Sequence, residues 1–552
     1  MTGGRGGAFA ALILAITSGL ADRASAQEIR PYRPAFDVQD YAIAVDVPDT
    51  GSTIHAVATI TVARRAPSDT LMLDLLDLRV SRVKLDGHVV RFRQGPESVA
   101  IPLPRTQSAS AMFNVAVEYG GVLRDGLIAH RDDAGRWTYF GDNWPNRARH
   151  WIPSVDHPSD KATVTWHVTA KSAQTVIANG KLVSKRPVVR ADGSRATEWV
   201  WRESRRIPVY LMVIGVAPLQ VYDLGDTACG LAELQRCVAQ SVYVAPEQHD
   251  FLPGPFAHAG EIVQLFSRLV GPFPYEKLAH MQSSTRFGGM ENASEIFYAD
   301  NGFRRGTMGD DIVAHETAHQ WFGDAVTERE WPHLWLSEGF ATYFAALWDR
   351  ADRGESAFRA RMDVIRRTIL SDSTAVRHRP VLDTIETDLL ALLNRNSYEK
   401  GGFVLHMLRV QVGDSAFFRA LRSYYAKHRH GTALSDDLRS EMERASGQQL
   451  GWFFDQWLRR PGYPELTATW HYDPTAREAT ITVAQGGPFG AFRVPLTIAA
   501  IDSTGAAHRA TIVLSASPNA MGQLRVPVPS EPKAMVLDPD VELLARLRVI
   551  RQ

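Results

Sequence analysis

The chain has 552 residues, which is too long for one hydrophobic core; at roughly 150 residues per domain this length predicts three or four domains. Its composition, 45% hydrophobic and 22% charged, is that of an ordinary globular protein. Lys and Arg together number 61, and so do Asp and Glu, so no net charge recruits nucleic acid or an anionic membrane surface.

The first 26 residues have the features of a secretory signal peptide. Arg5 supplies the positive charge, residues 8–20 form an apolar run, and Ala24-Ser25-Ala26 fits the small-residue cleavage rule. We therefore expect the mature chain to start at Gln27. An uncleaved anchor is the alternative, but the run is short for a membrane span, and no later stretch reaches about 18 unbroken apolar residues. These features predict an exported protein, periplasmic or secreted, without a membrane segment in its mature form.

Residues 27–245 are expected to form an N-terminal β domain. The larger apolar residues alternate in 41–47 and 54–62, as half-buried strands require. Asp86-Gly87 between two apolar runs is typical of a tight hairpin turn. Short strands at this spacing predict a saddle or sandwich of antiparallel sheets.

Cys229 and Cys237 are the only cysteines of the chain. They lie close together in a polar segment, and an oxidising compartment would favour a disulfide between them. Two unrelated free thiols are the alternative. A metal site is disfavoured, because no His or second Cys pair accompanies them.

The hydrophobic period changes near Pro246, and residues 246–461 are expected to form a mixed and then largely helical domain. The predicted helices span residues 261–270, 311–323, 337–349, 358–370, 398–412, 416–428, 435–445 and 451–459. Residues 462–552 alternate again, in segments 466–472, 479–484, 492–500, 509–514 and 523–528. We interpret this last part as a small immunoglobulin-like β-sandwich, so the fold class is multidomain α+β.

A candidate metal site lies on the second of these helices, in the motif His315-Glu316-Thr317-Ala318-His319. Positions i and i+4 lie on one face of a helix, so His315 and His319 can reach the same ion. The flanking residues are apolar, and ionisable side chains in such surroundings are costly unless a metal binds them. The pattern therefore predicts one zinc ion per chain rather than a surface helix.

A catalytic zinc site has three protein ligands, and a carboxylate is expected as the third. Glu338 is the candidate, because the 18 residues between it and His319 allow the helix to end, a loop to turn and a second helix to start. The metzincin alternative needs a third His shortly after the second. Phe322 and Ala325 occupy the matching positions, so this alternative is rejected.

Glu316 is expected to act as the general base. Zinc lowers the pKa of a bound water from near 16 toward about 7, and a carboxylate one step round the helix from His315 can accept its proton. The same group can then deliver the proton to the leaving amine.

Three segments of the chain resemble the gluzincin aminopeptidases, the family of aminopeptidase N and leukotriene hydrolase. The segment from His315 to Thr327 with the one from Leu334 to Tyr343 is similar to the zinc-binding region of that family. Residues 288–292 match its G-x-M-E-N signature, and residues 398–401 match the segment that carries its catalytic tyrosine. The resemblance covers roughly residues 35–460, and it implies a thermolysin-like catalytic domain behind an N-terminal β saddle.

The resemblance also implies roles for individual residues. Tyr398 would stabilise the oxyanion opposite the metal. Glu291 would bind the free α-amine of the substrate, since a carboxylate in dry surroundings is the natural partner of that cation. Substrate would lie along the signature segment, where glycines let a peptide approach the backbone; the implied binding residues are Gly288, Gly289, Met290, Glu291 and Asn292.

One feature of the family is missing from the sequence. Members usually add a second amine-binding amide or acid from the N-terminal domain, ahead of the segment that matches residues 149–153. Here the sequence is Gly141-Asp142-Asn143-Trp144. Asp142 or Asn143 could substitute, or Trp144 could narrow the pocket, so the preference for the first residue stays open.

The resulting hypothesis is an exported zinc aminopeptidase that acts on peptides with a free N-terminus. A thermolysin-type endopeptidase and a catalytically inactive peptide-binding protein are the alternatives. G-x-M-E-N disfavours the first, and the complete set of candidate catalytic residues disfavours the second. The sequence supports no epoxide hydrolysis, and it leaves open the oligomeric state and how the active site is closed without the long helical domain that larger members append.

Overall fold

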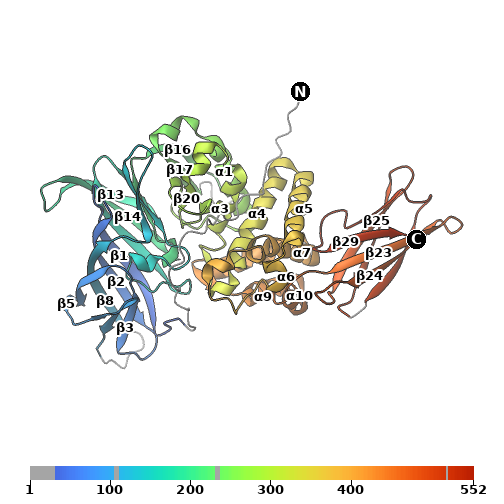
Figure 1. Cartoon of the computed structure of the whole chain (residues 1–552), viewed down its shortest axis with the longest axis horizontal. Helices are drawn as coiled ribbons and strands as arrows, with labels where there is room; N and C mark the ends of the chain where they lie inside the picture. Colours follow the sequence, from blue (N-terminus) through green and yellow to red (C-terminus); the bar gives the residue numbers. More distant parts are fainter. Residues whose placement is uncertain (1–31, 105–110, 230–236, 518–519) are drawn as a thin grey trace.

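The computed structural model describes residues 32–104, 111–229, 237–517 and 520–552. The predicted signal peptide lies outside the described residues. Three parts follow one another along the long axis of the molecule: a β domain, a helix-rich middle part and a second β domain that contains the C-terminus (Figure 1). Within the described ranges, no helix is both long and apolar enough to cross a bilayer.

The N-terminal domain is built around an eight-stranded sheet of order β13-β14-β11-β1-β2-β8-β4-β5. Alternate side chains of β1, such as Tyr41, Ile43 and Val45, are buried, as the period-2 pattern predicts. The sheet is antiparallel except for the pair β1–β11, which is parallel. Its strands are β1 (Phe36–Asp46), β2 (Thr53–Arg64), β4 (Arg79–Leu85), β5 (His88–Val89), β8 (Met112–Val122), β11 (Lys161–Lys171), β13 (Lys181–Val189) and β14 (Arg195–Pro208).

Two smaller sheets complete this domain. One has the order β12-β15-β10-β9 and the other β3-β7-β6. Their strands are β3 (Thr70–Asp74), β6 (Arg93–Gln94), β7 (Ser98–Pro102), β9 (Gly126–Arg131), β10 (Trp137–Asp142), β12 (Thr175–Ala178) and β15 (Ile214–Ala217).

Two strands ahead of the predicted boundary at residue 245 join a sheet of the middle part of the molecule. Strands β16 (Gln220–Thr227) and β17 (Val238–Val244) belong to a five-stranded sheet of order β16-β17-β18-β20-β19. The other strands of this sheet are β18 (Leu278–Ser283), β19 (Gly289–Met290) and β20 (Glu295–Ala299). β17 pairs in parallel with β18, and alternation within a strand does not reveal its partner. Cys229 and Cys237 form a disulfide at the end of this sheet between β16 and β17.

Helices fill the rest of the catalytic domain. All eight predicted helical segments are present, with bounds that differ by a few residues, and two short helices, α2 and α6, were not predicted. The helices are α1 (Ala259–Val270), α2 (Asp300–Arg305), α3 (Asp310–His319), α4 (Trp335–Arg353), α5 (Glu355–Ser371), α6 (Ala375–His378), α7 (Gly401–Val412), α8 (Asp414–His428), α9 (Ser435–Ser446) and α10 (Gly451–Leu458). A short parallel pair, β21 (Val326–Glu328) with β22 (Gly431–Ala433), links the end of the metal-motif segment to the segment after α8.

The C-terminal domain has two sheets, of order β27-β24-β23-β29 and β26-β25-β28. The five predicted strand segments are present, and two further strands, β28 and β29, complete the sheets. The bounds are β23 (Glu465–Asp473), β24 (Glu478–Gly486), β25 (Val494–Ile501), β26 (Ala507–Leu514), β27 (Met521–Pro527), β28 (Ala534–Leu537) and β29 (Arg546–Arg551).

Candidate active site

Helix α3 presents the two histidines of the motif on one face. Asp310 and Asp311 lie in its first turn, where carboxylates interact favourably with the helix dipole. His315 and His319 follow at the i, i+4 spacing, and their Nε2 atoms are 3.2 Å apart. His319 is buried, whereas the side chain of His315 is 20% exposed, so the pair can be reached from one side.

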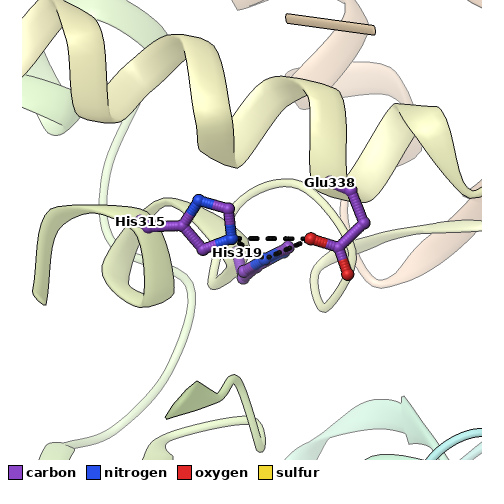
Figure 2. A group of neighbouring side chains, drawn as sticks. All are labelled: His315, His319 and Glu338. Atoms are coloured by element: carbon purple, nitrogen blue, oxygen red, sulfur yellow. Dashed lines mark hydrogen bonds and ion pairs between the residues drawn. The ribbon is translucent and has the colours of Figure 1, made fainter. Parts of the chain in front are cut away.

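Helix α4 brings Glu338 to the same point (Figure 2). Its Oε2 atom lies 3.5 Å from Nε2 of His315 and 3.4 Å from Nε2 of His319. Zinc binds its nitrogen and oxygen ligands at about 2.0–2.1 Å, which separates two ligands of a tetrahedral site by about 3.3–3.4 Å. The three side chains therefore already have the spacing of a zinc site, and their donor set of two imidazoles and one carboxylate fits zinc.

His319 is oriented by groups behind it. Its Nδ1 lies 3.2 Å from the carbonyl oxygen of Phe322 and 3.0 Å from Oγ of Ser337. A ligating His commonly donates its second N–H in this way, which fixes the ring and the tautomer. Ser337 was not predicted, although it is the polar residue directly before the predicted ligand Glu338.

The carboxylate of Glu316 packs against the edge strand β19. A Cβ added to Gly289 would lie 2.1 Å from Oε1 of Glu316, so a side chain at this position would displace the carboxylate. Burial raises the pKa of the Glu316 carboxyl well above its usual value, and the nearby carboxylates of Glu291 and Glu338 raise it further while His319 lowers it. A carboxyl group with a raised pKa is suited to accept and release a proton during a reaction.

Glu291 lies beside this base rather than in solvent. Single ligand atoms of Glu291, Glu316 and His319 are all within 4.8 Å of one another. Glu291 is 6% exposed, and burial together with the charge of Glu338 raises its pKa to about 7, with His319 opposing. Of the other signature residues, Gly288 and Gly289 are half-buried, while Met290 and Asn292 are buried.

Among the residues that the structure describes, strand β19 forms the edge of its sheet and pairs only with β20. Its outer side can therefore pair with an extended peptide, which is the strand-addition mode of peptide binding.

Tyr398 reaches the metal site from a π-helical turn, Asn396–Lys400, that runs into α7. Its ring stacks on that of His315 with centroids 6.1 Å apart. Burial, and then the charges of Glu338 and Glu291, raise the pKa of the phenol well above its usual value. Tyr398 consequently stays protonated and can donate a hydrogen bond.

Two glycines set how closely the helix of Glu338 approaches the turn of Tyr398. A Cβ added to Gly339 would lie 2.8 Å from the carbonyl carbon of Gly401. The backbones of α4 and α7 thus touch directly between the two functional side chains.

The residues considered for a second amine ligand are engaged in other contacts. Asp142 pairs with Arg147 at 2.6 Å and with Arg286 at 3.5 Å. The amide of Asn143 accepts from the indole of Trp151 and donates to the carbonyl of Met212. These pairings disfavour both as amine ligands.

Trp144 is buried and makes edge contacts with two other aromatic rings. Its ring centroid lies 6.0 Å from that of Phe287, just before the signature segment, and 5.6 Å from that of Trp331. Trp144 therefore packs against residues of the catalytic domain.

A helix-borne pair of histidines, a carboxylate from the next helix and a buried carboxyl base together define a metallohydrolase of the zinc-peptidase class. The comparison with family models specifies this further. Residues 258–457 match the peptidase family M1 domain, and residues 38–211 match the peptidase M1 N-terminal domain. The chain belongs to peptidase family M1.

Relatives with known names agree with this assignment. A probable aminopeptidase 1 of Sulfurisphaera tokodaii is 24% identical over 79% of this chain and 55% of its own length. Aminopeptidase N of Lactococcus lactis is 25% identical over 79% of this chain and 52% of its own. The chain thus spans about half the length of these curated relatives.

Solved structures show the same fold. The M1 zinc metallopeptidase of Deinococcus radiodurans has a TM-score of 0.66 and 26% identity over 77% of this chain and 94% of its own. Aminopeptidase A of Legionella pneumophila has a TM-score of 0.79 over 94% of this chain and 60% of its own, and at 17% identity it supports the fold alone. Together with the donor set, the family identifies zinc as the metal of this site, and the predicted family and cofactor are confirmed.

Proposed function

We propose that the protein is an aminopeptidase that hydrolyses the first peptide bond of peptides with a free N-terminus. The observation that carries this proposal is the buried Glu291 beside the base Glu316. Hydrolysis of a peptide bond needs only the metal, a base and an oxyanion donor. A further buried carboxylate at the site is therefore expected to bind a cation. The α-amine of a substrate is a suitable cation. The names of the curated relatives support this proposal.

The roles of the residues follow from their positions. Zinc at His315, His319 and Glu338 would supply a Lewis acid that makes water a nucleophile at neutral pH. Glu316 takes the proton from the attacking water and passes it to the leaving amine. Tyr398 donates a hydrogen bond from its phenol to the oxygen on which charge develops.

Glu291 recognises the free N-terminus of the substrate. A carboxylate bound to an ammonium group contributes about 1.5–3 kcal/mol per charged hydrogen bond, and an uncharged acetylated end would leave it buried and unpaired. The peptide continues along the outer edge of β19, where the glycine backbone allows close approach. Peptide binding is also found in the Deinococcus radiodurans metallopeptidase, whose mutant was solved with a Tyr-Ser-Ala substrate.

The decisive experiment compares kcat/KM for a free peptide and its N-acetylated counterpart, in the wild type and in Glu291→Ala. We expect the wild type to prefer the free peptide strongly and Glu291→Ala to lose most of that preference with its zinc intact. If the wild type cleaves both peptides equally well, the thermolysin-type endopeptidase replaces this proposal. If zinc-loaded wild type cleaves neither, the protein is a peptide-binding member of the family without activity.

We also propose that the protein is exported. The signal-like segment before Gln27 and the disulfide between Cys229 and Cys237 support this, because disulfides persist in oxidising compartments. The test is the N-terminal sequence of the protein purified from its own cells. A chain that starts at Gln27 agrees with export, and a chain that retains residues 1–26 contradicts it.

A further inference from the structure

Gln320, the residue after the zinc ligand His319, is fully buried and all parts of its amide are used. Its Nε2 donates to the carbonyl oxygen of Glu291 at 3.0 Å and to Oδ2 of Asp324 at 2.9 Å. Its Oε1 accepts from the backbone N–H of Ser294 at 2.8 Å. One side chain therefore links the end of the zinc helix to both sides of the turn that follows the amine-binding carboxylate.

Asp324, the second acceptor of the Gln320 amide, is itself held in place by hydrogen bonds. The backbone N–H of Asp324 donates to the carbonyl of His319 at 3.1 Å, so Asp324 lies in the turn that closes α3. The ammonium group of Lys161, from strand β11 of the N-terminal domain, donates to the carbonyl oxygen of Asp324 at 2.8 Å. The same ammonium donates to the carbonyl of Ala325 at 3.1 Å. Gln320 is consequently anchored on a turn that is also hydrogen-bonded to the N-terminal domain.

The turn after Glu291 also makes hydrogen bonds with the N-terminal domain. Ser294 has a φ of 65°, and its hydroxyl accepts from the backbone N–H of Gly180 at 2.7 Å. The amide of Asn179 donates to the carbonyl of Ala293 at 2.8 Å. Both Asn179 and Gly180 belong to the N-terminal domain, so the segment that carries Glu291 lies between that domain and the end of α3.

We propose that Gln320 is a positioning residue that fixes the carboxylate of Glu291 relative to the zinc ligand His319. In this way it sets the distance from the substrate's α-amine to the scissile bond, and it supports exopeptidase specificity rather than hydrolysis itself. The inference rests on the proposed function, because it needs Glu291 to bind the amine. A merely structural Gln320 would affect stability but not the choice between free and acetylated peptides.

The test uses Gln320→Met, which keeps the approximate volume and removes every hydrogen bond of the amide. The matched control is Gln485→Met in the C-terminal domain. Gln485 is also buried, and its amide brackets the backbone of Phe492, donating to the carbonyl at 3.0 Å and accepting from the N–H at 2.7 Å. For each full-length protein the zinc content, the melting temperature, and kcat and KM for a free and an acetylated peptide are measured.

We expect Gln320→Met to keep its zinc and to lose roughly tenfold in kcat/KM for the free peptide, mainly through KM, while the acetylated peptide changes little. Gln485→Met should be destabilised to a similar degree but keep the wild-type preference. An unchanged preference in Gln320→Met, or loss of its zinc, overturns the inference.

If the proposed function itself is wrong, the wild type will show no preference for the free peptide over the acetylated one, so this outcome can be distinguished from failure of the inference. If Gln320→Met does not fold, Gln320→Glu makes the same comparison, because it keeps the acceptor for Ser294 and loses the donor to Glu291. If both variants fail to fold while Gln485→Met folds, the role of Gln320 is structural and the inference is overturned.

Discussion

The three zinc ligands and Glu291 are neighbours in space, yet different kinds of structure hold them in place. The ligands are side chains on two adjacent helices of one domain, and they converge to within 3.5 Å of each other. Glu291 follows a two-residue edge strand, and the turn after it is bound by Gln320 and by residues of the N-terminal domain. The metal half of the site, formed by the three ligands with Glu316 and Tyr398, is therefore held within one domain. The substrate half, which carries Glu291, depends on contacts between two domains.

This difference separates two kinds of mutational effect. Changes in the metal half should abolish turnover for every substrate, because they act on zinc or on the proton transfer. Changes in the substrate half should alter which peptides are cleaved and leave the zinc content unchanged.

The largest effect is expected for His319→Ala. A site reduced from three protein ligands to two no longer holds zinc during dialysis, so activity on all peptides should fall to the background level. The zinc content per chain, measured by atomic absorption, checks this. Full retention of zinc by the variant would contradict the assigned ligand set.

Glu316→Gln should keep the metal and lose roughly 10²–10⁴-fold in kcat, because an amide cannot accept the proton of the attacking water. Zinc content and kcat on the same preparation test the prediction. A variant with wild-type turnover would mean that another group is the base.

Tyr398→Phe should cost about 10²–10³-fold in kcat, as removal of one oxyanion donor does elsewhere, with little change in KM. The zinc content should stay at one per chain. An equal loss that appears only in KM would place the phenol in substrate binding and move Tyr398 from the metal half of the site to the substrate half.

The smallest effect on turnover is expected for Lys161→Met at the junction with the N-terminal domain. Its four oxygen partners, on Asp324, Ala325, Thr327 and Gly431, would be left without this donor, at a cost of roughly 1–3 kcal/mol in the free energy of unfolding. KM for free-amine peptides should rise several-fold while zinc is retained.

Arg460→Met is the matched control for Lys161→Met. The guanidinium of Arg460 donates to the carbonyls of Ala491 and Phe489 and so joins the catalytic domain to the C-terminal domain. It should lower stability without raising KM. An increase in KM of the same size in both variants would show that the two junctions do not differ.

The metal half could be predicted from the sequence because the geometry of its two histidines is a property of one helix. The i, i+4 spacing places His315 and His319 together whatever the rest of the fold does. Glu338 can then be predicted as a carboxylate that follows in an apolar helix. The roles of Tyr398 and Glu291 could be predicted only from the resemblance to the family, since neither residue is distinctive without the surrounding motif.

The substrate half could not be predicted in the same way. Gln320 acts through the backbone of Glu291, 29 residues earlier in the chain, and no local pattern encodes such a contact. The only available signal was a polar residue between a predicted ligand and the apolar pair Trp321-Phe322. The pairing of β17 with a strand that begins at Leu278 could not be predicted for a similar reason.

The contact between Gly339 and Gly401 has a consequence for how this site can vary. With no side chain between the two backbones, nothing at this crossing can be enlarged, exchanged or repacked to adjust the spacing between Glu338 and Tyr398. In a library of active variants selected for new peptide preferences, we expect substitutions to accumulate around β19 and Trp144, while position 339 stays glycine.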